Sequence, residues 1–168
     1  DLSTEYWAEW WKGAGKPEDA YLYYHCATLD GGWDILQLAE YYGIGDRLIV
    51  TARGMDPGVM VPQKQVHQIY NTWDVHLSTT LGEGWGLVGH ESAACRIAQA
   101  LPDYAAYGEW MKDGAFLVGC SGYSAGINGI NTIGGIANKD QVINAIDYMY
   151  QLPHMRDHYA KKAFDVAT

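Results

Sequence analysis

Residues 74–95, DVHLSTTLGEGWGLVGHESAAC, contain the pattern that decides the fold of this chain. An apolar strand is expected over 74–79, and glycines follow it at positions 82, 84 and 86. From Leu87 the residues are small or apolar and predict a helix. A glycine-rich turn between a strand and a helix lets backbone approach a ligand and directs the free amides of the helix N-terminus outward. The segment therefore predicts a ligand-binding turn whose amides, beginning with those of Gly86 and Leu87, suit a phosphate or diphosphate.

Two carboxylates accompany this turn. Glu83 lies among the glycines, and Glu91 follows eight positions later, about one turn into the expected helix. A phosphate would repel both groups, so they are better suited to accept hydrogen bonds from sugar or ribose hydroxyls. Plainer interpretations exist: Glu83 as a solvated loop carboxylate, and Glu91 as a partner of the helix dipole. Their combination with the glycines in a strand–turn–helix context favours a functional site.

Strand-like and helix-like patterns alternate along the rest of the chain. Further strands are expected at 20–25, 47–51 and 115–118, and helices at 2–12, 33–42, 63–72, 87–100, 139–151 and 153–166. The glycine-rich stretch 119–136 is expected to form a long loop. This alternation predicts a three-layer α/β/α Rossmann-like domain with a mostly parallel sheet. Ligands bind beyond the carboxyl ends of such strands, so His25 is a further candidate.

Length and composition fit one globular domain over residues 1–168. The chain is 48% hydrophobic and only 18% charged, which allows a single buried core and excludes a disordered chain. Its net charge of −9 argues against a nucleic-acid or anionic-membrane partner. No apolar run approaches the roughly 20 residues of a membrane span. Three cysteines, with no secretory signal and no N-x-S/T sequon, predict a cytoplasmic location.

The opening segment resembles the donor-binding motif of retaining GT-B glycosyltransferases. This family, glycosyl transferases group 1 or family 4-like, includes sucrose synthases and bacterial mannosyltransferases. Its motif is a glutamate, then glycine–aromatic–glycine–leucine, and a second glutamate eight residues after the first. The chain matches with Glu83, the residues 84–87 (GWGL) and Glu91. The preceding YNTWDVHLSTTL at 70–81 is also similar, and the resemblance extends over nearly the whole chain.

The resemblance implies a reaction. It implies transfer of a hexose from a nucleotide diphosphate sugar to an acceptor, with retention of configuration and without a metal or another cofactor. The acceptor would be a glycan, a lipid or a small molecule. The family also implies a first strand, an Arg and a Lys that hold the diphosphate, and an N-terminal acceptor lobe, all before Asp1. We therefore expect the chain to be the donor-binding part of a larger enzyme, weak or inactive alone.

The resemblance also implies roles for matched positions. Glu83 would be the catalytic residue and bind hydroxyls of the donor sugar, whereas Glu91 would hold the ribose. The remaining binding candidates are Gly84, Gly86 and Leu87 at the turn, with Thr80 and His25 after the expected strands. Among these, the amides of Gly86 and Leu87 would face the diphosphate. The loop after Thr51, through Val61, would lie against the base.

The sequence departs from the family pattern after the motif. Arg96 replaces a glycine and Ala98 a proline, so the helix is expected to run on toward Ala100. Two alternatives stay open, and the departures support the second of them. One is a nucleotide-sugar epimerase of GT-B-like fold, in which a similar glutamate holds ribose. The other is a non-catalytic GT-B-like lobe used for binding or assembly.

Overall fold

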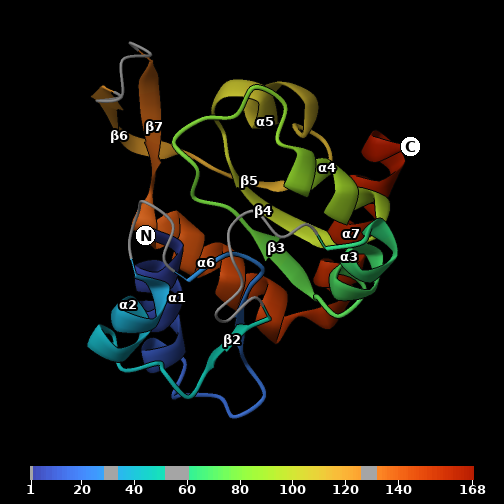
Figure 1. Cartoon of the computed structure of the whole chain (residues 1–168). Coiled ribbons are helices and arrows are strands. Elements are labelled where there is room, and N and C mark those ends of the chain that lie inside the picture. Colours follow the sequence, from blue (N-terminus) through green and yellow to red (C-terminus); the bar gives the residue numbers. More distant parts are fainter. Residues whose placement is uncertain (1, 29–33, 52–60, 126–131) are drawn as a thin grey trace. The chain divides into compact units, whose positions relative to one another are not determined.

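The computed structural model describes residues 2–28, 34–51, 61–125 and 132–168. They form two compact units, unit 1 from Asp1 to Pro62 and unit 2 from Gln63 to Thr168. Each unit combines helices with parallel strands (Figure 1), so the predicted α/β class is confirmed. None of the helices among these residues is long and apolar enough to cross a bilayer.

Unit 1 contains two helices and one parallel pair of strands. Its elements are α1 (Leu2–Gly13), β1 (Leu22–Tyr24), α2 (Ile35–Tyr41) and β2 (Leu48–Val50). The strands pair in register, with Leu22 opposite Leu48, and both leucines are buried. Helix α2 begins at Asp34, whose carboxylate accepts two backbone N–H bonds of the first turn.

Unit 2 is built on a parallel sheet with the strand order β3–β4–β5. Its elements are α3 (Gln63–Tyr70), β3 (Val75–Leu77), α4 (Leu87–Ala94), β4 (Ala98–Pro102), α5 (Ala105–Trp110), β5 (Phe116–Val118), β6 (Cys120–Ala125), β7 (Ile133–Ala137), α6 (Lys139–Gln151) and α7 (Pro153–Ala167). All five residues of the central strand β4 are buried. Helices α4, α5, α6 and α7 all contact β4. Figure 1 shows α4 in front of the strands and α6 behind them.

The expected helix over 87–100 is wrong in its second half. Helix α4 ends at Ala94, and 98–102 form the buried strand β4 instead. The helix stops because Arg96 adopts a left-handed conformation, with φ of 59°. The guanidinium lies 4.6 Å from the ring centroid of Phe164 on α7. Arg96 thus keeps the backbone shape that a glycine would supply and adds a cation–π contact.

The expected loop over 119–136 is also wrong where the structure describes it. Residues 120–125 and 133–137 are β6 and β7, which pair antiparallel. The sequence did not predict them because Gly, Ser and Asn dominate the stretch and the strands bury little apolar surface. Strand β7 instead depends on close backbone contact: a β-carbon at Gly134 would lie 2.7 Å from the Leu81 side chain.

Candidate functional site

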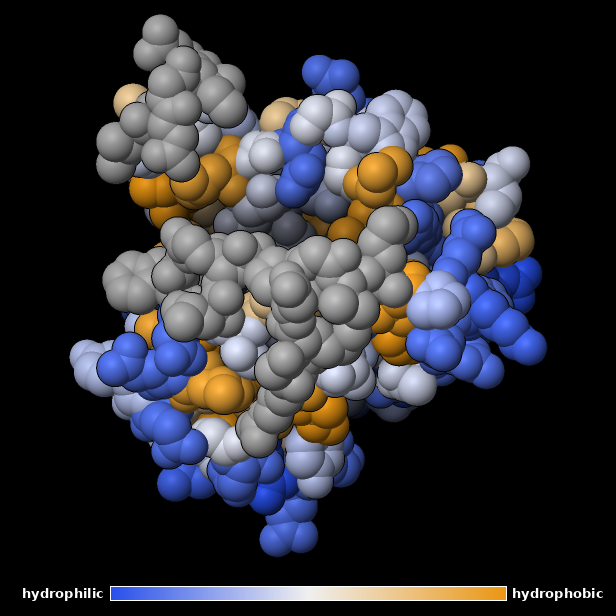
Figure 2. Space-filling view, in the orientation of Figure 1, coloured by the Kyte–Doolittle hydropathy of each residue, from blue (hydrophilic) through white to orange (hydrophobic). Residues whose placement is uncertain are grey.

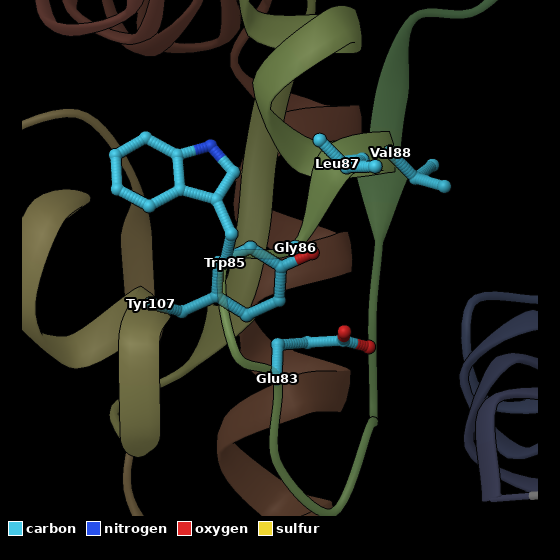
Figure 3. A pocket seen from close by; sticks show the side chains of 6 residues that line it. All are labelled: Glu83, Trp85, Gly86, Leu87, Val88 and Tyr107. Atoms are coloured by element: carbon cyan, nitrogen blue, oxygen red, sulfur yellow. The ribbon is translucent and has the colours of Figure 1, made fainter.

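An open pocket of about 400 Å³ lies at the start of α4, in unit 2. Six residues line it: Glu83, Trp85, Gly86, Leu87, Val88 and Tyr107 (Figure 3). Five come from the glycine-rich turn and the first turn of α4, and the sixth comes from α5. The pocket therefore lies beyond the carboxyl end of β3, where parallel sheets bind ligands.

Gly86 creates the sharp entry into α4. It is the N-cap residue, with φ of 81° and ψ of 64°, a left-handed conformation that favours glycine. The ring of Tyr107 packs directly on it, and Tyr107 is only 2% exposed. A β-carbon at Gly86 would lie 2.4 Å from this ring, and one at Gly89 would lie 2.7 Å from it. Both glycines are thus required by the close approach of the tyrosine.

Tyr107 forms the floor of the pocket between the helix start and Glu83 (Figure 3). Burial, together with the negative charge of Glu83, raises the pKa of Tyr107 to about 12. The backbone N–H of Gly89 acts in the opposite direction, because it stabilises the phenolate by hydrogen bonding. Tyr107 is therefore a neutral phenol at physiological pH.

Glu83 is held in place by its own turn. The hydroxyl of Thr80 donates to Glu83 Oε1 at 3.0 Å. The backbone N–H of Ala106 also donates to the Glu83 carbonyl at 3.3 Å. Thr80 and Glu83, both predicted site residues, are thus in direct contact, with Thr80 orienting the carboxylate that faces the pocket.

The turn is fixed at two further points. The N–H of Gly135 on β7 donates to the Leu81 carbonyl at 2.7 Å. Trp110 Nε1 on α5 donates to the Trp85 carbonyl at 2.9 Å. A backbone N–H on β7 and a side-chain N–H on α5 therefore hold the carbonyls before and after Glu83.

The rim of the pocket is apolar. Trp85 is 50% exposed, Leu87 67% and Val88 48%. Figure 2 shows apolar side chains at the surface over the start of α4. Large apolar side chains clustered around a pocket mark a binding surface more often than scattered ones do.

Glu91 lies one turn further along α4, outside the lining of this pocket. Its Oε2 accepts a hydrogen bond of 2.7 Å from Tyr70 on α3. Burial and this bond to a carboxylate raise the pKa of the Tyr70 phenol. Burial, with the Glu91 charge, also raises the pKa of the Cys95 thiol. Glu91 is exposed, so its carboxylate is accessible while Tyr70 orients it.

A buried network of polar side chains connects α4 to the sheet. His76 Nδ1 donates to Gln99 Oε1 at 2.7 Å, and Gln99 Nε2 donates to Ser92 Oγ at 3.1 Å. The hydroxyl of Ser92 then reaches the Gly89 carbonyl at 3.2 Å. Burial lowers the pKa of His76. This network links β3, β4 and α4, and so fixes the helix on the sheet.

The predicted site residues are therefore distributed over three places. Glu83, Gly86 and Leu87 line the pocket; Thr80 supports Glu83, and Gly84 lies in open space on the turn. Glu91 faces α3. His25 belongs to unit 1, where its Nδ1 lies 2.9 Å from Thr51 Oγ1. Residues 52–60 of the loop expected against the base lie outside the described residues.

Sequence reasoning missed Tyr107, which shapes the pocket as much as any predicted residue. The residues next to it in the sequence are polar and aromatic, with no apolar repeat at helical spacing, so α5 was not predicted. The one available signal was the glycine at 89, a second small residue on the face of α4 that Tyr107 covers. No three His, Cys, Asp or Glu side chains gather as metal ligands among the residues that the structure describes.

No protein-family model matches the sequence, and no curated protein matches it significantly. Solved structures share its fold. WaaG, a glycosyltransferase involved in lipopolysaccharide biosynthesis, matches with a TM-score of 0.72 and 15% identity, over 99% of this chain and 38% of that one. HepE from Anabaena, solved in complex with UDP, matches with a TM-score of 0.70 and 14% identity, over 99% of this chain and 39% of that one.

A third similar structure is a separate C-terminal domain. It belongs to LpcC, a glycosyl transferase group 1 family protein from Francisella tularensis, with a TM-score of 0.66 and 15% identity. The match covers 98% of this chain and 75% of that one, whereas the chain spans little more than a third of WaaG or HepE. The chain has the fold of the C-terminal lobe of GT-B glycosyltransferases, as the resemblance in its sequence predicted.

Proposed function

We propose that the chain is the donor-binding part of a retaining glycosyltransferase that uses a nucleotide diphosphate hexose. The observation that carries this proposal is the start of α4. There Gly86 opens the helix in a left-handed conformation, directly beside Glu83 and beyond the carboxyl end of β3. The first amides of a helix have no acceptor inside it and carry the positive end of its dipole, which suits a diphosphate.

Each proposed role follows from the chemistry of the group. The amides at Gly86 and Leu87 stabilise the diphosphate as negative charge develops on the leaving group, and no metal is needed for this. Glu83, oriented by Thr80, accepts hydrogen bonds from hydroxyls of the donor hexose. Glu91, held by Tyr70, accepts hydrogen bonds from the hydroxyls of the ribose. The complex of HepE with UDP is in keeping with a nucleotide at such a lobe.

The proposal includes the setting of the reaction. The acceptor is a glycan, a lipid or a small molecule, and an N-terminal lobe supplies most of its contacts. The 38% coverage of WaaG is consistent with such a second lobe. The three cysteines are free, which suits the cytoplasm. Arg96 adopts a left-handed conformation, which glycine adopts readily, so the fold accommodates this departure from the family pattern.

Calorimetric titration of UDP, GDP and their hexose conjugates into the chain tests the proposal. We expect one nucleotide series to bind, and Glu91→Gln to weaken it by roughly tenfold through loss of a charged acceptor. Glu109→Gln, an exposed glutamate on α5, is the matched control and should bind as the wild type does. Binding of no nucleotide, or equal binding by Glu91→Gln, would contradict the proposal. Interconversion of the bound sugar would instead indicate the epimerase.

A further inference from the structure

The indole of Trp85 is a rigid and exposed surface at the pocket rim. Half of the residue is accessible, although its ring is stacked on that of Trp110 at 5.3 Å between centroids and 4° between planes. The hydrogen bond from Trp110 Nε1 to the Trp85 carbonyl fixes the backbone at the same point. The imidazole of His90 lies against both rings, at 5.9 and 5.5 Å. An aromatic ring held this firmly loses little freedom when a ligand covers it.

Trp85 and Glu83 serve different parts of the pocket. In Figure 3 the indole and the Glu83 carboxylate point to opposite sides of Tyr107. A single hexose hydrogen-bonded to Glu83 would therefore leave the indole uncovered. The pocket of about 400 Å³ is lined by both Glu83 and Trp85, and the exposed apolar side chain of Leu87 also lines it.

The nucleotide side of α4 is also separate from Trp85. Glu91, the proposed ribose ligand, is bound to Tyr70 on α3. Trp85 is bound to Trp110 on α5. The nucleoside is thus expected on the α3 side and not on the indole, with the diphosphate amides at Gly86 between them.

The chemistry of an exposed indole selects among the remaining ligands. The face of an aromatic ring carries partial negative charge, and the C–H groups on one face of a pyranose carry partial positive charge. The hydroxyls of the same sugar project sideways, where they stay exposed to water at the open rim. A rigid and exposed aromatic face, in the same pocket as a carboxylate suited to a sugar, therefore fits a pyranose.

We propose that Trp85 binds a pyranose ring of a carbohydrate acceptor, at a subsite next to the donor sugar at Glu83. This inference rests on the proposed function and deepens it, because it selects a glycan among the three acceptor classes. The subsite adds acceptor contacts on the donor-binding lobe itself.

Saturation-transfer NMR with maltotriose and cellotriose, in the presence of UDP, tests this subsite. We expect saturation transfer to the ring C–H protons of at least one trisaccharide. Trp85→Ala should weaken its binding by roughly tenfold, whereas Trp85→Phe, which retains a ring, should retain most of it. Tyr123→Ala, which removes an exposed aromatic ring on β6, is the control and should bind as the wild type does. Thermal unfolding followed by circular dichroism verifies that each variant is folded.

UDP calorimetry on the same variants separates this inference from the proposed function. We expect Trp85→Ala to weaken trisaccharide binding by a larger factor than UDP binding, because the proposed ligands of UDP are the amides at Gly86 and Leu87 and the Glu91 carboxylate, and not the indole. If UDP binds but neither trisaccharide does, or if Trp85→Ala binds trisaccharide normally, the subsite is wrong and the proposed function stands. If Trp85→Ala loses UDP instead, the indole holds the base and the subsite is again wrong. If trisaccharide binds through Trp85 but no nucleotide binds, the proposed function fails.

Discussion

The ring of Tyr107 closes on the backbone of Gly86 so tightly that a β-carbon at Gly86 would lie 2.4 Å from two ring carbons. The left-handed φ of 81° is a second, independent constraint on the same residue. Because Tyr107 is buried in the core cluster with Leu101 and Met111, it has no space to move aside. The glycine-rich turn and the core of unit 2 therefore meet at one pair of residues.

Gly86→Ala should consequently lower the free energy of unfolding by about 3 kcal/mol, from backbone strain and overpacking together. Urea denaturation measures this loss. Gly84→Ala is the matched control two residues earlier, where a β-carbon would meet nothing within 4 Å. It should change stability by no more than about 0.5 kcal/mol. Equal effects at both positions would mean that the contact with Tyr107 is not the cause.

Arg96 combines an unfavourable backbone conformation with a favourable ring contact, and two variants separate these effects. Arg96→Ala removes the contact with Phe164 but keeps the left-handed strain, so it should be destabilised by about 0.5–1 kcal/mol. Arg96→Gly removes both, and should be more stable than Arg96→Ala by about 1 kcal/mol. Thermal unfolding of the two variants gives the comparison. An alanine variant as stable as the glycine variant would show that no strain is present.

Gln99 lies between His76 and Ser92 in the buried hydrogen-bond network, so its replacement should lower stability strongly. Gln99→Leu leaves the buried His76 N–H without its acceptor and removes the hydrogen bond that Ser92 Oγ accepts, at a cost of about 3 kcal/mol in unfolding free energy. Gln68→Leu, on the exposed face of α3, is the control and should be nearly neutral. Chemical denaturation compares them. If Gln99→Leu is as stable as the wild type, the packing of the leucine compensates for the lost hydrogen bonds.

The lowered pKa of His76 predicts that acid destabilises the fold. Burial keeps His76 neutral in the folded state, whereas in the unfolded state it takes up a proton below its ordinary pKa of 6.5. The contribution of His76 to stability is therefore complete above pH 6.5 and decreases as the pH falls, by about 1.4 kcal/mol per pH unit.

His76→Asn is the variant that tests this pH dependence, because it retains a donor near Nδ1 but has no titratable ring. Urea denaturation between pH 5 and 8 should show a flatter profile for this variant than for the wild type. The two profiles should run parallel above about pH 7. A wild-type slope in His76→Asn would assign the acid sensitivity to another group.

The sequence predicted the elements whose patterns were periodic, and it failed where tertiary contacts decide the conformation. The helices at 139–151 and 153–166 match α6 and α7 closely, since both have apolar faces and a proline marks the boundary. Strand β4 was missed because its residues, AQALP, have little strand propensity and are held there by burial alone. The stop before it depends on Arg96, whose left-handed conformation no propensity predicts.

For the candidate site, the sequence identified the turn but not the residues that close it. Glu83, Gly86 and Leu87 line the pocket, whereas Thr80, expected to bind the ligand, contacts Glu83. Tyr107 and Trp110 reach the turn from α5, more than 20 residues later in the chain than Glu83. Long-range contacts of this kind leave no local pattern in the sequence.

Three backbone carbonyls of the glycine-rich turn accept hydrogen bonds from Gly135, Ala106 and Trp110. These bonds have a thermodynamic consequence. A loop rich in glycine would ordinarily lose much conformational entropy when a ligand orders it. In this chain the loss has already occurred on folding, because hydrogen bonds from α5 and β7 hold the turn in one shape. Ligand binding at α4 then requires little reordering of the turn, and its affinity reflects the contacts themselves.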